Sequence, residues 1–131
     1  MKNLLKLEEL AQFLLVLFAL YTAHASWWVF LLLLIGPDIS MLGYLVNTRI
    51  GAVAYNLFHH KGVAILVIML AQVMRYGLIG DCSDELMTIG LVLYGHASLD
   101  RIFGYGLKFG DSFQHTHLGW IGKSGAEGRR P

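Results

Sequence analysis

The sequence predicts an all-α fold: a polytopic membrane four-helix bundle with both termini cytosolic and a short C-terminal cap segment. Three observations predict it. Hydrophobic residues make up 56% of the chain and charged residues only 15%, against about a quarter charged in a typical soluble domain. Apolar runs long enough to cross a bilayer alternate with short polar connections. The basic residues fall on one side of the resulting up-down-up-down arrangement.

Length and charge limit the alternatives. With 131 residues the chain has room for one domain, and its net charge of +1 argues against nucleic acid as a partner. The single cysteine, Cys82, excludes an internal disulfide and a cysteine-based metal cluster. We expect residues 1–108 to form the four-helix transmembrane domain. Residues 109–131 should form a cytosolic tail, which we expect to be disordered from residue 125 onward.

The first span is expected over residues 4–23. Residues 23–25 resemble a signal-peptidase site, but Glu8 and Glu9 stand where a signal peptide is normally positive. A second apolar run also begins at once with Trp27. The segment is therefore interpreted as a retained membrane helix.

The second span is expected over residues 26–46 and should be kinked. Pro37 has no N–H to donate to the carbonyl of Leu33, and Gly36 precedes it. The kink should leave a backbone acceptor free beside Asp38, as membrane binding sites often require.

The third and fourth spans are expected over residues 50–78 and 85–103, each long enough to cross roughly 30 Å of hydrocarbon at 1.5 Å per residue. The third is interrupted by residues 59–62. An alternative is therefore a short amphipathic helix followed by a shorter span.

Charge sets the orientation. Residues 24–26 carry no Lys or Arg, and residues 81–85 are acidic. The positive-inside rule then places both termini and the second connection in the cytosol. The basic residues on that side are Lys2, Lys6, Arg49, Lys108, Lys123, Arg129 and Arg130.

All four predicted helices carry a polar group near the cytosolic face, within roughly 15 Å of it at 1.5 Å per residue. Such side chains are costly in lipid and usually face a bundle interior or water. They therefore predict a shared polar layer. Its members are Glu9, Asp38, Asn56, His59, His60, His96 and Asp100.

Spacing within the helices points to metal binding. Asn56 shares a helix face with either His59 or His60, and His96 shares one with Asp100. Bundle-core metal sites are built from inward carboxylates and histidines in this way. Oxygen and nitrogen ligands without thiolates suit zinc, manganese or iron. The candidate ligands are Asp38, Asn56, His59, His60, His96 and Asp100.

Simpler interpretations stay open for part of this layer. Glu9 can equally lie at the interface as a helix N-terminal acid. The histidines at 59 and 60 can belong to an interfacial loop if the third span begins at Gly62. Asp100 can pair with Arg101 instead of contributing to a site.

The C-terminal residues mix aromatics, glycines and the pair His115 and His117. We expect residues 104–120 to fold back over the cytosolic mouth of the bundle. Arg101 and Lys108 would then bind an anionic headgroup or a phosphate.

The segment from Leu10 onward and residues 37–44, 55–62, 96–108 and 115–119 together resemble the domain-of-unknown-function family numbered 4260, a group of small bacterial membrane proteins without an assigned activity. This resemblance implies an integral protein of the bacterial inner (plasma) membrane with membrane lipid as a partner. It does not indicate an oligomeric state.

A remoter similarity is to YdjM-type membrane-bound metal-dependent hydrolases. The matching motifs are Pro37-Asp38, His60-Lys61-Gly62 and the His-xxx-Asp of His96 and Asp100. The chain departs from that family at residues 38–41, where the family has Asp-x-Asp-His, and at residues 63–65, where it has Thr-His-Ser. Several of the family's ligands therefore have no counterpart here.

Two functions follow, with a third less supported. The first is a metal-dependent hydrolase of a lipid or phosphoester, with Glu9 as general base and the metal held by Asp38, His59 or His60, His96 and Asp100. The second is a non-enzymatic protein whose polar layer binds or conducts an ion or a proton. The third, haem ligation between a histidine of the third helix and His96, lacks an attachment motif.

Overall fold

The computed structural model describes residues 1–77 and 82–122. Helices account for most of this part of the chain, which confirms the all-α class. The elements are α1 (Lys2–Thr22), α2 (Trp27–Ile35), the 3₁₀ helix η1 (Gly36–Leu45), α3 (Thr48–His59), α4 (Lys61–Arg75), α5 (Ser83–Phe103), β1 (His115–Thr116) and β2 (Gly119–Trp120). The predicted disorder from residue 125 and the basic residues Lys123, Arg129 and Arg130 lie outside the described residues.

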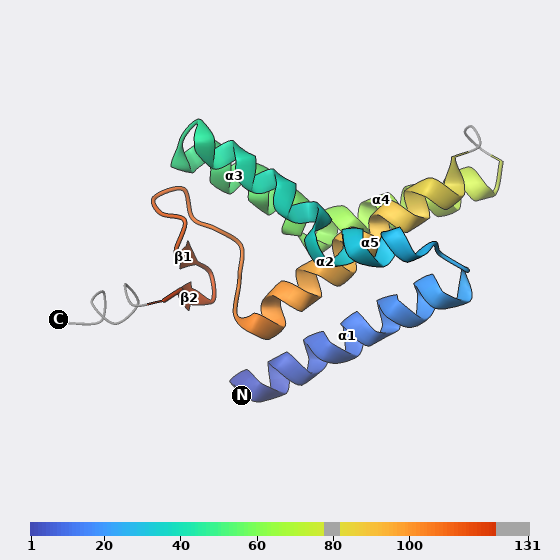
Figure 1. Ribbon diagram of the computed structural model, residues 1–131, viewed down its shortest axis with the longest axis horizontal. Helices are drawn as coiled ribbons and strands as arrows, with labels where there is room; N and C mark the ends of the chain where they lie inside the picture. The colour runs from blue at the N-terminus through green and yellow to red at the C-terminus, as the bar shows by residue number, and fades with distance from the viewer. Residues whose placement is uncertain (78–81, 123–131) are drawn as a thin grey trace.

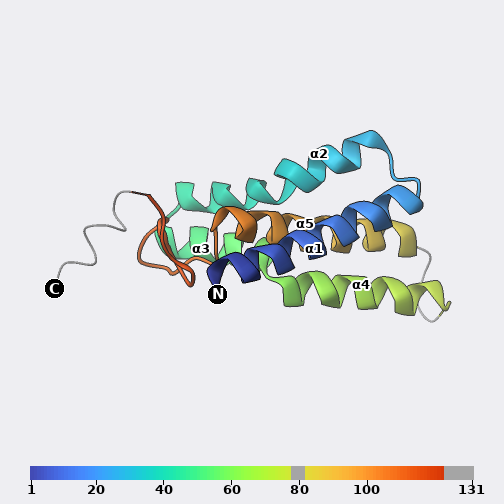
Figure 2. The ribbon, with the colours of Figure 1, turned by 90° about the horizontal axis from the view of Figure 1, so that it is seen from below.

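Helix α5 is the centre of the arrangement and contacts α1, α2, η1, α3 and α4. Helix α1 runs beside it, while α2 and α4 lie on opposite sides of it (Figures 1 and 2). Helix α3 folds back along η1 to form a second arm. The start of α1 and residues 104–122 lie at the same end of the molecule (Figure 1).

The second predicted helix changes type at its proline. Regular α-helix ends at Ile35, and η1 continues the same run from Gly36 to Leu45 with Pro37 in its first turn. Without an N–H at Pro37, the α-helical hydrogen-bond ladder cannot continue through this point. The structure therefore has a switch to 3₁₀ geometry beside Asp38, and the kink expected there stays a prediction.

The third predicted helix is broken. Instead of one helix over residues 50–78, α3 and α4 meet at His60 with a bend of 47°. His60 adopts an extended backbone (φ −86°, ψ 112°), and its Nδ1 accepts a hydrogen bond from the Gly62 N–H at the start of α4. The interruption over residues 59–62 thus separates two helices, as in the alternative expectation. Leu78, the predicted end of this span, lies outside the described residues.

The apolar core lies between α1, α2 and α5 and contains Val16, Leu20, Val29, Leu33 and Val92. Close approach depends on Gly95 of α5, where a Cβ would lie 2.6 Å from Leu33 and 2.8 Å from Val16. Many large apolar side chains point away from this core along every helix, among them Phe18, Ile35, Val53, Leu66 and Ile89.

Within the described residues, one helical run is long and apolar enough to cross a membrane alone, namely Trp27–Leu45, which joins α2 and η1. The bent pair α3 and α4 meets the same criterion together. The count of four spans and the cytosolic position of the termini stay predictions.

Residues 104–122, termed here the C-terminal segment, pack against the arm made by η1 and α3. Gly104 ends α5 in the left-handed conformation (φ 91°), and β1 and β2 then form a short antiparallel hairpin. The Phe113 ring meets the Tyr44 ring edge-on at 5.2 Å. The segment therefore folds back on the end of the bundle, as expected from its sequence.

Candidate metal centre

Four side chains from three elements converge beneath the C-terminal segment. They are Asp38 of η1, His59 at the end of α3, and His96 and Asp100 of α5. One potential ligand atom from each lies within 4.8 Å of all the others. The residues come from separate parts of the sequence and meet because α5 contacts both η1 and α3.

The two imidazoles present the same nitrogen to the two carboxylates. His59 Nε2 lies 3.6 Å from Asp38 Oδ1 and 3.5 Å from Asp100 Oδ2. His96 Nε2 lies 3.3 Å from Asp38 Oδ1 and 3.7 Å from Asp100 Oδ1. The rings are 4.9 Å apart between centroids, with the carboxylates beside both Nε2 atoms, which leaves no room for a haem macrocycle between them.

Hydrogen bonds on the far side of each ring fix the tautomers. His59 Nδ1 lies 2.8 Å from the Tyr55 carbonyl oxygen, and His96 Nδ1 lies 2.9 Å from the Leu33 carbonyl oxygen. A carbonyl oxygen only accepts, so each Nδ1 carries the proton and donates it. Each Nε2 then faces the carboxylates, and His96 Nε2 lies at hydrogen-bonding distance from Asp38 Oδ1, so that a proton or a metal ion can lie between them. Metal-binding histidines are oriented by hydrogen bonds of this kind.

Two ring nitrogens and two carboxylates thus bring four potential ligand atoms together. His59 Nε2 is buried, with no hydrogen-bond partner in the described part of the chain. An unpaired buried polar atom costs roughly 1–3 kcal/mol. A divalent cation among the four side chains would accept the lone pairs and neutralise both carboxylates. The donor set therefore fits a metal ion, and two nitrogen and two oxygen ligands suit zinc, manganese or iron.

The proline break orients one of the ligands. The Leu33 carbonyl, which an N–H at position 37 would occupy in a regular α-helix, is the acceptor for His96 Nδ1. The backbone acceptor expected beside Asp38 is thus used across the bundle, by a residue 63 positions further along the chain.

Tyr55 supports the centre and was not anticipated from the sequence. This buried side chain donates a hydrogen bond of 2.5 Å to Asp100 Oδ2 and stacks on the His59 ring at 3.7 Å. It stands four residues before His59 on α3, so helical spacing from a candidate ligand is the signal that could have found it.

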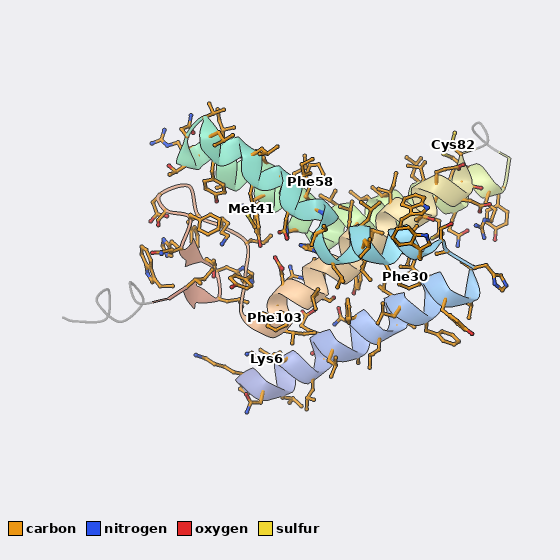
Figure 3. All side chains as sticks on the ribbon, in the orientation of Figure 1. Lys6, Phe30, Met41, Phe58, Cys82 and Phe103 are labelled. Atoms are coloured by element: carbon orange, nitrogen blue, oxygen red, sulfur yellow. The ribbon has the colours of Figure 1, made fainter. Side chains whose placement is uncertain are left out.

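A cavity of about 320 Å³ opens beside the two carboxylates. Asp38 is 37% exposed and Asp100 17%, whereas both histidines are almost fully buried. A metal ion here would be reached from the side of the carboxylates. On this side Met41 of η1, labelled in Figure 3, lines the cavity. The lining residues are Asp38, Met41, Tyr55, Asp100, Tyr105, Lys108 and Phe113. A larger groove of about 680 Å³ lies between α2 and α5 and is mainly apolar.

Three of the other predicted site residues lie outside this cluster. His60 is exposed and caps α4 at the bend. Asn56 binds the backbone of Lys108 through both ends of its amide. Arg101 does not line the cavity.

Glu9, the expected general base, is engaged elsewhere. Its carboxylate pairs with the Lys61 ammonium, which also donates to Gln12, and Tyr94 donates to the same Gln12 oxygen. This network ties α1 to α4 and α5, and it accounts for Glu9 as a structural contact.

The two tail histidines also have separate partners. His115 binds Asp111 at 2.7 Å and stacks on the Trp120 ring. His117 Nδ1 accepts from the Leu107 N–H at 2.8 Å. Both histidines therefore contact other residues of the C-terminal segment. The hydrogen bond from His115 holds the pKa of the exposed Asp111 carboxyl below its usual value.

Comparison with known families identifies the family of the chain. Residues 2–121 match the model of a domain of unknown function, DUF4260, and the chain belongs to this family. No curated protein matches the chain, and no solved structure does.

Proposed function

We propose that this DUF4260 protein is an integral membrane protein that holds one divalent metal ion and hydrolyses a phosphoester with it. Asp38, His59, His96 and Asp100 would hold the ion. The observation that carries the proposal is the convergence of two Nε2 atoms on two carboxylates, with each ring oriented by the hydrogen bond of its Nδ1. Among the described residues, His59 Nε2 has no hydrogen-bond partner.

The bound ion would supply Lewis acidity, polarising a phosphoryl oxygen and lowering the pKa of water at the site. The protein contributes the rest. Tyr55 holds Asp100 in place, and the carbonyls of Tyr55 and Leu33 keep both rings in the ligating tautomer. The cavity on the exposed side of the carboxylates would leave room for water or substrate beside the ion, as catalytic metal sites require.

The membrane assignment is supported by the outer surface of the helices. In the run Trp27–Leu45 only 22% of an 18-residue stretch is buried, whereas a core helix of a soluble protein would be mostly covered. Side chains such as Phe18 (64% exposed) and Leu66 (65% exposed) extend this apolar surface to α1 and α4. Such an exposed apolar surface supports lipid as the solvent of these helices.

Metal analysis tests the first half of the proposal. Protein purified in detergent should carry, or take up on incubation, one zinc, manganese or iron ion per chain. Asp38→Asn and His96→Ala should each lose it, because each removes a ligand. Glu8→Gln, which changes an exposed carboxylate of α1, is the matched control and should retain it. Wild-type protein that binds none of these metals would refute the site.

Hydrolysis is tested separately on the metal-loaded protein. We expect release of product from phosphomonoester or phosphodiester substrates, including phospholipids, that stops on chelation and in both ligand variants. A stoichiometric ion with no turnover of either ester class would leave a metal-binding protein without this activity.

A further inference from the structure

The cavity beside the candidate metal centre contains a buried cation. Lys108 is only 4% exposed, and its ammonium lies 4.1 Å from the centroid of the Phe113 ring and 5.0 Å from that of Tyr55. Over residues 1–77 and 82–122, no carboxylate oxygen lies within 4.0 Å of this ammonium. Aromatic faces stabilise a cation, but they do not neutralise its charge.

The position of Lys108 is fixed by Asn56. The Lys108 N–H donates to Asn56 Oδ1 at 2.7 Å, and Asn56 Nδ2 donates to the Lys108 carbonyl at 2.9 Å. A bridge between Lys108 and Thr116 of the hairpin holds the other side of the backbone. The backbone of Lys108 is therefore held on both sides, and its side chain extends into the cavity that it lines.

The cavity places this cation and the two carboxylate ligands around one space. Asp38 and Asp100 line it together with Lys108 and Phe113. Its volume of about 320 Å³ corresponds to roughly ten water molecules at about 30 Å³ each. This is enough for a phosphate group and the first atoms of its ester. Burial lowers the pKa of the Lys108 ammonium, and the charge of Asp100 acts in the opposite direction.

We propose that this cavity binds the phosphate group of an ester, with one phosphoryl oxygen toward the metal ion and another accepting a hydrogen bond from Lys108. The inference rests on the proposed function, since the two carboxylates alone would repel an anion. Lys108 is then the residue that selects an anionic substrate, and Asn56 positions it. Phosphate binding should accordingly require the metal.

Calorimetric titration of inorganic phosphate into metal-loaded protein in detergent tests the proposal. Wild type should bind phosphate, and metal-free protein should not. Lys108→Met and Lys108→Gln should bind it at least about 10-fold more weakly, the loss expected for one charge-assisted hydrogen bond, with their metal content intact. Lys108→Arg should recover part of the affinity. Lys6→Met, the same change on the exposed start of α1 (Figure 3), should behave as wild type.

The outcomes separate the two proposals. Wild type without metal would refute the metal centre, whereas a metal-loaded Lys108→Met or Lys108→Gln protein with wild-type phosphate affinity would refute the role of Lys108 alone. Metal content also reports whether each variant is folded. Repeating the titration in phosphatidylcholine nanodiscs with and without phosphatidic acid identifies the source of the phosphate. Competition by phosphatidic acid assigns the cavity to a lipid headgroup, and its absence assigns it to a soluble phosphoester.

Discussion

Asn56 should be the residue on which docking of the C-terminal segment depends most. Its amide makes two hydrogen bonds to the backbone of Lys108, of 2.7 and 2.9 Å. Asn56→Ala removes both and leaves the Lys108 N–H and carbonyl without these partners. At about 1 kcal/mol for each hydrogen bond, the loss is about 2 kcal/mol. Since 1.4 kcal/mol is a factor of ten, undocking should become roughly 30-fold more frequent.

Asn56→Asp provides an internal scale. Its carboxylate oxygen still accepts from the Lys108 N–H, but it cannot donate to the Lys108 carbonyl. The loss should therefore be about half that of Asn56→Ala, or about 1 kcal/mol. Hydrogen exchange of the protein in detergent, followed by mass spectrometry, measures both. The exchange rate of peptides from residues 104–122 should be lowest in wild type, higher in Asn56→Asp and highest in Asn56→Ala.

Asn47→Ala is the matched control for this series. Asn47 caps α3 by accepting from the Ile50 N–H at 2.8 Å, so its loss should cost about 1 kcal/mol in the first turn of that helix. Exchange in the C-terminal segment should not change. Equal exchange of residues 104–122 in wild type and Asn56→Ala would show that the segment is held by something other than this amide.

Three further changes have expected outcomes. Pro37→Ala supplies an N–H that competes for the carbonyl fixing one imidazole, so metal affinity in a chelator competition should fall about 10-fold. Gly51→Ala puts a Cβ 2.3 Å from the Tyr44 ring and should cost about 1–3 kcal/mol in detergent unfolding. The pKa of Asp111 is lowered by His115, so this contact stabilises the hairpin above the usual Asp pKa of 3.8 and is lost as pH falls below it. Hairpin exchange should therefore rise in acid.

Each of these has its own comparison. For Gly51→Ala the comparison is Gly36→Ala, which adds a Cβ at an ordinary 3.4 Å from Leu32 and should leave the free energy of unfolding unchanged. Asp111→Asn should remove the acid sensitivity of the hairpin, and a variant as sensitive as wild type would assign it to another group. Unaltered metal affinity in Pro37→Ala would mean that the Leu33 carbonyl does not orient the ligand.

Local spacing predicted the parts of the site that depend on one helix. The four-residue interval between His96 and Asp100 places both on one face, and both enter the cluster. The missing N–H of Pro37 predicted a free acceptor, which His96 uses. Each of these follows from backbone geometry within a few residues.

The rest depends on tertiary contacts that spacing does not encode. Whether His59 or His60 faces the carboxylates is decided by the end of α3, because one extended residue at the bend turns His60 outward. Asn56 has a polar partner 52 residues away in the C-terminal segment. Glu9 likewise pairs with Lys61 across the bundle. Side chains such as these find partners only once the helices have packed.

The order of the site along the chain separates the candidate ligands from the wall of the cavity. All four candidate ligands lie at or before residue 100, whereas the wall made by Tyr105, Lys108 and Phe113 follows them. Ligand geometry and substrate selection are therefore encoded in two different parts of the chain. Substitutions in the C-terminal segment can change the shape and charge of the cavity without removing any candidate ligand.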